Sequence, residues 1–170
     1  MADRRKKAAK KPPPRGRKKK GFTVQEVLKR AAAKERAAHK LYSDLSGKID
    51  DAAARGLLKD LAAEEKRHVK MVSDVAGGRK KINEKITGVA ADLHITEYLK
   101  PAKLSARASF QEVLIYAMKR EVQAISAYTA MANAVKSPQI KKMCRFLATQ
   151  EKAHKLRLER FYDDVIYREN

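Results

Sequence analysis

Two short stretches of the chain carry residue types that bind metal ions. Glu65 and His68 form the first stretch and Glu151 and His154 the second, each in the pattern Glu-x-x-His and 86 residues apart. On a helix, residues three apart lie on the same face, so each Glu and His pair could share one ion. One such pair carries little information, but two pairs at a fixed offset indicate a repeated unit.

The repeat continues in the segments that precede each of these pairs. Glu35 and Tyr42 recur as Glu121 and Tyr128, again 86 residues later. Four segments of the chain therefore each offer one Glu, and two of them also offer a His. The expected metal ligands are Glu35, Glu65, His68, Glu121, Glu151 and His154.

The elements that must position these ligands are four helices. Inward positions recur at alternating steps of three and four, as in Leu58, Leu61, Glu65, His68 and Val72, which is typical of a helix packed in a bundle. Glycines and prolines are few, seven and five, which also favours helices. Helix starts are expected at Thr23 and Ser109, each followed by a Glu in a capping box, at Asp50 or Asp51, and at Ser137.

A long connection separates the two predicted helical hairpins. Residues 79–108 show no long helical period, and thirty residues exceed an ordinary loop. Apolar residues around Lys100-Pro101 predict a packed crossover with one helical turn; they are Leu93, Ile95, Tyr98, Leu99 and Leu104. The fold class predicted is all-α, a four-helix bundle of two duplicated hairpins joined by this crossover.

A bundle core that contains four glutamates requires compensating charge. Each uncompensated buried carboxylate costs several kcal/mol, whereas two divalent cations balance four carboxylates and two imidazoles complete the ligand set. Carboxylate with imidazole suits iron, or manganese as the alternative. Taken singly, each Glu is most simply a solvated helix residue, but six ligand-type residues on inward positions at one offset favour a di-metal site.

Four other residues could also contribute to or lie near such a site: Tyr42, Tyr128, Cys144 and Glu64. Tyr42 and Tyr128 are either core aromatics that need a hydrogen-bond partner or residues whose hydroxyls orient the ligand carboxylates; we favour the second interpretation. Cys144 is expected to be a small buried apolar residue. Glu64, directly before Glu65, is expected to point away from the site.

His39 and His94 fall outside the repeat. We therefore expect both to be ordinary surface or loop histidines.

The charge of the chain is strongly positive and unevenly spread. Residues 1–21 contain eleven lysines and arginines against Asp3 alone, a net charge of +10, which is half of the +20 of the chain. With three consecutive prolines and like charges, this segment is expected to be a disordered arm preceding a single domain of residues 22–170. Such an arm attracts polyanions, so nucleic acid is one candidate partner of residues 1–21, and the alternative is an arm that only solubilises or localises the protein.

The cysteine content and the hydropathy of the sequence predict where in the cell the protein is located. Cys144 is the single cysteine, so no internal disulfide and no paired-thiolate metal site is expected. No apolar run approaches the length of a membrane span. The expected location is the cytoplasm, without a membrane partner.

Two further stretches of the sequence, together with the ligand pattern, resemble a known protein family. The ligand pattern, His94 to Pro101 (HITEYLKP) and Tyr162 to Asn170 (YDDVIYREN) together resemble the rubrerythrin branch of the ferritin-like superfamily, over residues 22–170. The resemblance implies a non-haem di-iron centre that reacts with hydrogen peroxide or dioxygen, a role in oxidative-stress defence, and a homodimer.

The sequence departs from the pattern of that family in two places. Rubrerythrins add a rubredoxin domain with two Cys-x-x-Cys pairs, which are absent here, so an external electron donor such as a rubredoxin-like protein is expected. They also carry an extra Glu where this chain has Ala124. The leading hypothesis is a peroxidase or oxidase; the alternatives are a ferroxidase for iron detoxification or storage, and a DNA-associated protein that resembles mini-ferritins with lysine-rich arms.

Overall fold

The computed structural model describes residues 21–81, 93–100 and 108–167. Four long helices, α1 (Val24–Ser46), α2 (Ala52–Ala76), α4 (Phe110–Ala134) and α5 (Pro138–Tyr162), are joined by a short helix α3 (Ile95–Tyr98) in the crossover, and α5 continues as the π-helical turn η1 (Asp163–Tyr167). No strand occurs in the described ranges, and the all-α prediction is confirmed. Of the predicted arm only Gly21 lies within the described residues, and Leu104 lies outside them.

The helix starts follow from local side-chain chemistry. Glu26 N donates to Thr23 Oγ1 at 3.2 Å, and Thr23 N donates to Glu26 Oε2 at 2.8 Å, so two backbone groups at the start of α1 are satisfied. The same reciprocal pair opens α4. The N-cap residues are Thr23, Asp51, Ser109 and Ser137, as predicted. At the end of α2, Gly78 takes the left-handed conformation with φ 69°, which an L side chain disfavours.

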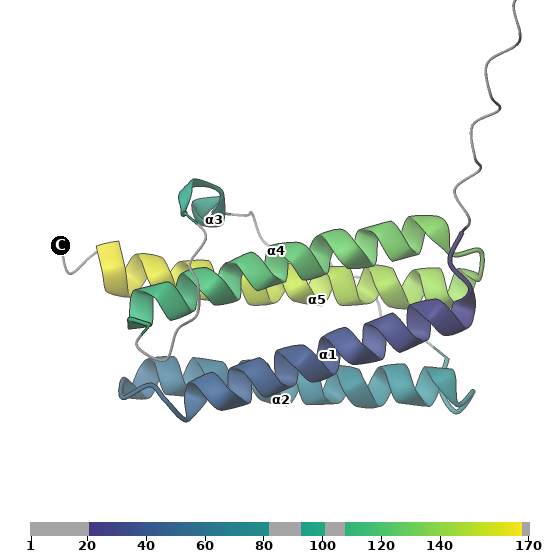
Figure 1. The fold of residues 1–170 in the computed structure, drawn as a ribbon, viewed down its shortest axis with the longest axis horizontal. Helices are drawn as coiled ribbons and strands as arrows, with labels where there is room; N and C mark the ends of the chain where they lie inside the picture. Colours follow the sequence, from purple (N-terminus) through teal and green to yellow (C-terminus); the bar gives the residue numbers. More distant parts are fainter. Residues whose placement is uncertain (1–20, 82–92, 101–107, 168–170) are drawn as a thin grey trace, which may run out of the picture.

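The two hairpins, α1 with α2 and α4 with α5, lie side by side and form a ferritin-like bundle (Figure 1). Helix α1 contacts both α4 and α5 of the second hairpin, and α2 contacts α5. Helices α1 and α4 run in opposite directions, and the end of α2 and the start of α4 lie at opposite ends of the bundle (Figure 1). Ligands on all four helices can therefore meet at the middle of the bundle.

Two apolar clusters fill the ends of the bundle. The first includes Val27, Ala31, Val72, Met131, Ile140, Met143, Cys144 and Leu147, and the second includes Leu45, Leu58, Leu61, Leu114, Met118 and Leu158. On every long helix the ligand-type residues lie between the positions that enter these two clusters. The hydrophobic ends therefore enclose a polar layer at mid-length. The same steps of three and four also predict inward positions at Leu28, Ala38, Ala124, Phe161 and Val165, but these residues are only half-buried.

The crossover is anchored through its helical turn. Thr96 is buried, and its backbone N–H donates to Glu159 Oε1 of α5 at 2.8 Å. Lys119 Nζ of α4 donates to the carbonyl of Thr96 at 2.6 Å. The predicted helical turn is confirmed, but packing of its whole apolar set is not, since Tyr98 is 85% and Leu93 43% exposed.

None of the helices in the described part of the chain is long and apolar enough to cross a bilayer.

Candidate metal centre

The six predicted ligands lie together at the middle of the bundle. Helix α1 supplies Glu35, α2 supplies Glu65 and His68, α4 supplies Glu121, and α5 supplies Glu151 and His154. None of these residues is more than 7% exposed. The steps of three and four along each helix place them on the inward face, as the sequence pattern predicts. That they bind metal stays a prediction.

The side chains form two overlapping clusters. One contains Glu35, Glu65, His68 and Glu151, and the other contains Glu65, Glu121, Glu151 and His154. In each cluster, one ligand atom from every residue lies within 4.8 Å of the others. Because Glu65 and Glu151 belong to both clusters, they are placed to bridge two ions, and each remaining Glu and His pair completes one side.

The two clusters are related by the sequence repeat. Adding 86 to Glu35 and His68 gives Glu121 and His154, and Glu65 corresponds in the same way to Glu151. The duplicated hairpins therefore form a centre with approximate two-fold symmetry.

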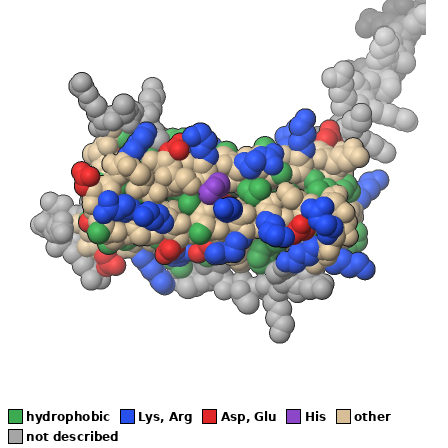
Figure 2. Space-filling view, turned by 90° about the horizontal axis from the view of Figure 1, so that it is seen from below, with side chains coloured by type: hydrophobic (Ala, Val, Ile, Leu, Met, Phe, Trp, Pro, Cys, Tyr) green, Lys and Arg blue, Asp and Glu red, His purple; other side chains and the backbone are tan. Residues whose placement is uncertain are grey.

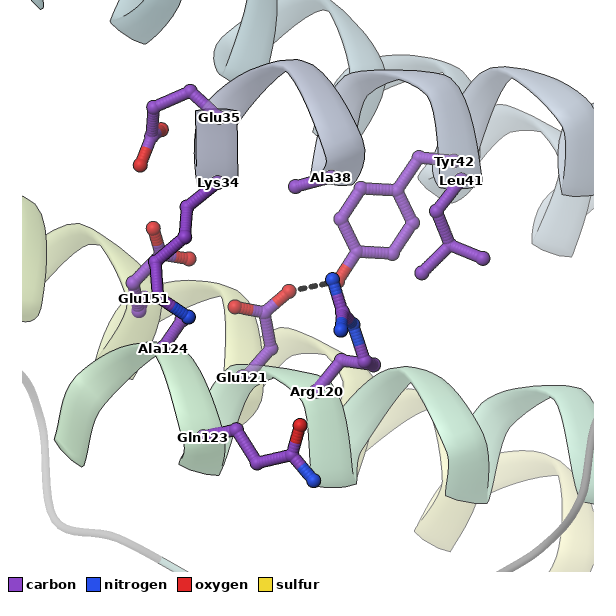
Figure 3. Close-up of a pocket in the computed structure, with 10 residues that line it drawn as sticks. All are labelled: Lys34, Glu35, Ala38, Leu41, Tyr42, Arg120, Glu121, Gln123, Ala124 and Glu151. Atoms are coloured by element: carbon purple, nitrogen blue, oxygen red, sulfur yellow. Dashed lines mark hydrogen bonds between the residues drawn. The ribbon is translucent and has the colours of Figure 1, made fainter. Parts of the chain in front are cut away.

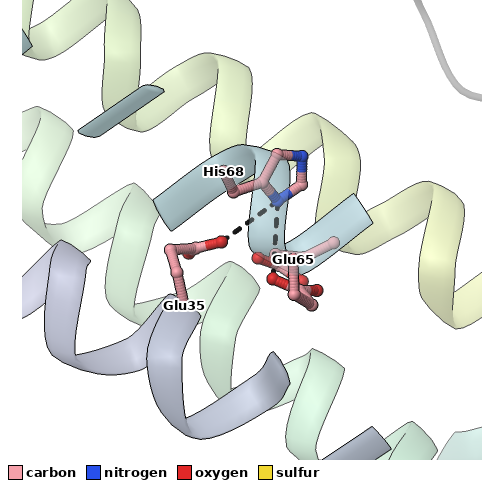
Figure 4. Close-up of side chains that lie close together, drawn as sticks. Glu35, Glu65 and His68 are labelled. Atoms are coloured by element: carbon pink, nitrogen blue, oxygen red, sulfur yellow. Dashed lines mark hydrogen bonds and ion pairs between the residues drawn. The ribbon is translucent and has the colours of Figure 1, made fainter. Parts of the chain in front are cut away.

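Both histidines turn the same ring nitrogen toward the carboxylates. His68 Nδ1 lies 3.0 Å from Glu35 Oε2 and 3.4 Å from Glu65 Oε2 (Figure 4). His154 Nδ1 lies 2.9 Å from Glu65 Oε1 and 3.4 Å from Glu151 Oε2. The two rings stack, with centroids 5.7 Å apart and planes 18° apart. The Nδ1 atoms are therefore the nitrogen donors that this geometry offers to an ion.

Several buried polar atoms at the centre lack hydrogen-bond partners, which indicates whether a pair of metal ions could be bound there. Both carboxylate oxygens of Glu65, Oε2 of Glu151 and Nδ1 of His154 are buried without a hydrogen-bond partner in the described part of the chain. Glu65 Oε1 and His154 Nδ1 are 2.9 Å apart, close enough for charge pairing, but their angles do not form a hydrogen bond. Buried polar atoms are rarely left without partners. Oxygen and imidazole donors that converge in this way fit iron or manganese.

Burial and mutual charge shift the pKa values within the centre. Burial raises the pKa of Glu35 to about 8, and burial together with the charge of Glu151 raises that of Glu121 well above its usual range. Burial lowers the pKa of His68, but the carboxylates of Glu35 and Glu65 outweigh it and raise the value to about 9. Without metal, the centre thus retains protons on carboxyl and imidazole groups, and ions must displace them.

The two tyrosines contact the carboxylates crosswise. Tyr42 on α1 donates to Glu121 Oε1 on α4, and Tyr128 on α4 donates to Glu35 Oε1 on α1. Burial raises the pKa of Tyr128, so its hydroxyl keeps its proton and remains a donor. Each hydroxyl is thus positioned to orient a ligand carboxylate of the facing helix, and this orienting role stays a prediction.

Glu64 does not point away from the site, contrary to expectation. Its Oε2 accepts a hydrogen bond from His154 Nε2 at 2.9 Å, and its Oε1 accepts one from Arg157 Nη1 at 2.7 Å. The hydrogen bond with His154, with Arg157 beside it, lowers the pKa of Glu64 to about 2 despite partial burial. A carboxylate on the outer nitrogen orients the ring and raises its basicity.

The repeat gives no signal for this residue, because the position equivalent to Glu64 is Gln150. Only the packing of α2 against α5 reveals the contact.

His39, His94 and Cys144 do not belong to the two ligand clusters. His39 is half-buried, and its Nδ1 donates to the carbonyl of Ala62 at 2.9 Å. His94 is exposed and lies 2.7 Å from Glu97. Cys144 is buried in an apolar cluster, as expected, and burial raises its pKa to about 11.

This fold and this site define a class of protein, the ferritin-like bundles whose core presents carboxylate and histidine ligands for two metal ions. The chain belongs to the rubrerythrin family, whose model matches residues 26–109 and 112–170. Membership implies a di-iron site and an oxidoreductase kind of activity. No curated protein and no solved structure matched the chain.

Proposed function

We propose that the protein is a non-haem di-iron oxidoreductase that reduces hydrogen peroxide, or dioxygen, in oxidative-stress defence. Glu35 and His68 would hold one iron, Glu121 and His154 would hold the other, and Glu65 and Glu151 belong to both clusters. Electrons come from an external protein donor such as a rubredoxin-like protein, because the chain has one cysteine and no paired-thiolate site of its own.

One observation carries this proposal: two four-ligand clusters that share two glutamates, with unsatisfied buried atoms facing their centre. When bound, a ferrous pair supplies the two electrons that cleave the O–O bond of peroxide. The chain holds the ligands in place, the apolar clusters at both ends exclude bulk water, and the tyrosine hydroxyls fix the outer carboxylates.

Anaerobic ferrous titration followed by peroxide tests the proposal. The expected result is about two irons per chain and an absorbance change on adding one equivalent of peroxide. The double substitution Glu65→Gln with Glu151→Gln removes both shared ligands and should abolish both signals. Glu97→Gln, on the exposed face of α3, is the matched control and should change neither. A wild-type protein that binds no iron, or whose bound iron ignores peroxide, contradicts the proposal.

A ferroxidase for iron detoxification or storage is the second candidate. Ala124 favours it, because without the extra Glu of rubrerythrins the centre has the plain set of four glutamates and two histidines. Aerobic ferrous loading combined with particle sizing separates the two functions. A closed shell that holds many irons per chain supports storage, and a small oligomer with about two supports the peroxidase.

Association with a polyanion such as nucleic acid is compatible with either activity. Besides the arm of residues 1–21, lysines and arginines cover the face seen in Figure 2. On α2 the exposed ones are Lys59, Lys66, Arg67 and Lys70. DNA retention at low and high salt, compared between the full chain and a chain without residues 1–21, tests this association. Retention that is unchanged by the deletion and insensitive to salt rejects it.

A further inference from the structure

A pocket opens between α1 and α4 directly above the metal centre (Figure 3). The metal ligands Glu35, Glu121 and Glu151 form its floor, with the Tyr42 side chain beside them. The pocket therefore leads from the surface to the ligand carboxylates.

The free volume within this pocket is small, about 20 Å³. One water-sized molecule needs roughly 10–15 Å³ on this measure, so the pocket admits one or two such units. Ala38 and Ala124 line it from the facing helices and are related by the 86-residue repeat, so the opening is bounded by two methyl groups. The space therefore admits only molecules of very few heavy atoms.

Two cations flank the opening. Lys34 lies directly before Glu35 and Arg120 directly before Glu121, and the repeat relates the two positions. Both side chains are half-buried. Neither forms a hydrogen bond or an ion pair with any residue in the described ranges, so no carboxylate of the floor lies within ion-pair distance of them. Their charges thus face the pocket mouth uncompensated.

Two half-buried cations without ion-pair partners at the rim of a narrow pocket favour negatively charged ligands. Four carboxylates and two divalent ions make the floor neutral, so the rim charge decides the sign of the local field.

We propose that Lys34 and Arg120 make this pocket a binding site for small monoanions of two or three heavy atoms, of the type of azide or the hydroperoxide anion. The proposal rests on the proposed function, since a metal-filled floor is what removes the repulsion of the carboxylates. It adds a selectivity by charge and size that the ligand set alone does not provide.

Azide is the probe, titrated anaerobically into the iron-loaded ferrous protein and followed by its displacement of bound nitric oxide. The double variant Lys34→Gln with Arg120→Gln should weaken azide binding by about 10-fold or more. Lys34→Arg with Arg120→Lys keeps both charges and should restore most of the affinity. Lys48→Gln with Lys136→Gln removes one exposed charge from each hairpin, outside the pocket, and is the matched control, with an expected change of less than about 2-fold.

A neutral ligand of similar size separates charge from access. Nitric oxide, added to the ferrous protein, should bind equally well to the wild type and to the Lys34→Gln, Arg120→Gln variant. Salt should weaken the binding of azide to the wild-type protein and leave the binding of nitric oxide unchanged. This experiment tests the effect of charge without a variant.

Unchanged azide affinity in the doubly neutral variant overturns the proposal, as does an equal loss of azide and nitric oxide binding. Iron content, measured first on every sample, shows which of the two proposals has failed. If the wild-type protein binds no iron, both the proposed function and the anion selectivity are wrong. If it binds two irons per chain but azide binding does not depend on salt, only the anion selectivity is wrong.

Discussion

The outer nitrogen of His154 lies 2.9 Å from Glu64 Oε2, whereas His68 has no such carboxylate in the described part of the chain. The ring of His68 instead meets Phe146 edge-on, with centroids 6.4 Å apart. A centre that is otherwise two-fold symmetric thus has different surroundings on its two sides. We expect the two metal positions to differ in affinity.

Glu64→Gln tests this difference. Loss of the carboxylate should lower the basicity of His154 and weaken one of the two ions by about 10-fold or more, with the other unaffected. Competition with a chelator, fitted to two sites, measures both affinities. Glu97→Gln is the control, and an equal weakening of both ions would show that the carboxylate does not act through His154.

Tyr42→Phe and Tyr128→Phe each remove the hydroxyl that donates to a buried carboxylate on the facing helix. Each substitution should lower the free energy of unfolding of the metal-free protein by about 1–3 kcal/mol, because the acceptor remains buried without its donor. Urea unfolding measures the loss. Tyr98→Phe, at an 85% exposed position, should cost close to nothing. If both buried substitutions prove equally harmless, the crosswise contacts do not join the hairpins.

The metal-free protein should lose stability as the pH rises from about 6 to 9. Glu35, with its pKa raised to about 8, and His68, with its pKa raised to about 9, both bind protons more tightly in the folded than in the unfolded chain. Stabilisation by His68 is complete below its unfolded pKa and is lost as the pH passes its folded pKa, and ionisation of buried Glu35 adds to the loss.

Thermal unfolding across this pH range measures the trend. Metal affinity should change in the opposite direction, because ions displace these protons. Calorimetry of metal binding in two buffers of different ionisation enthalpy measures the released protons. Metal binding without proton release would contradict the protonation states described here.

Glu159→Ala should detach the crossover helix. Glu159 is fully buried, accepts from Thr96 and lies 3.2 Å from Lys155 Nζ. Removing it breaks a buried ion pair and the hydrogen bond of the Thr96 backbone, and we expect the free energy of unfolding to fall by about 1–3 kcal/mol. Amide hydrogen exchange should speed up first in α3, before the long helices respond. Glu97→Ala, on the same turn but exposed, is the control; uniform acceleration in both variants would argue against a local anchor.

Ala124→Leu should close the pocket above the centre. The larger side chain fills a cavity of about 20 Å³, so azide and nitric oxide should both bind more weakly while iron content stays at the wild-type level. This variant separates access to the metal centre from the charge of the rim, because the Lys34→Gln, Arg120→Gln variant should weaken the binding of azide alone. Normal binding of both ligands would place the route to the metals elsewhere.

The helices and their inward faces were predictable because both depend on local periodicity. A step of three or four residues places Glu65 and His68 on one face wherever the helix packs, and Thr23 or Asp51 starts a helix through its own side chain. The same periodicity turns all six ligand-type residues toward the bundle axis.

Contacts set by how the hairpins pack could not be predicted in the same way. Glu64 reaches His154 only because α2 lies beside α5, and the repeat hides this contact because Gln150 replaces Glu64 in the other half. Tyr98 is apolar enough to suggest burial, yet the turn is held through Thr96 and Glu159, which leaves the ring outside. Lys34 and Arg120 resemble ordinary surface cations until α1 and α4 are placed face to face.

The sharing of Glu65 and Glu151 by both clusters has a consequence for the integrity of the molecule. Each half of the chain holds three of the six ligands, so neither half can complete a site alone. Bound ions would therefore link two halves that the backbone joins only through the crossover, in addition to the apolar clusters that both halves share. A chain cut by a protease within that crossover should hold its two hairpins together more tightly with metal ions bound than without them.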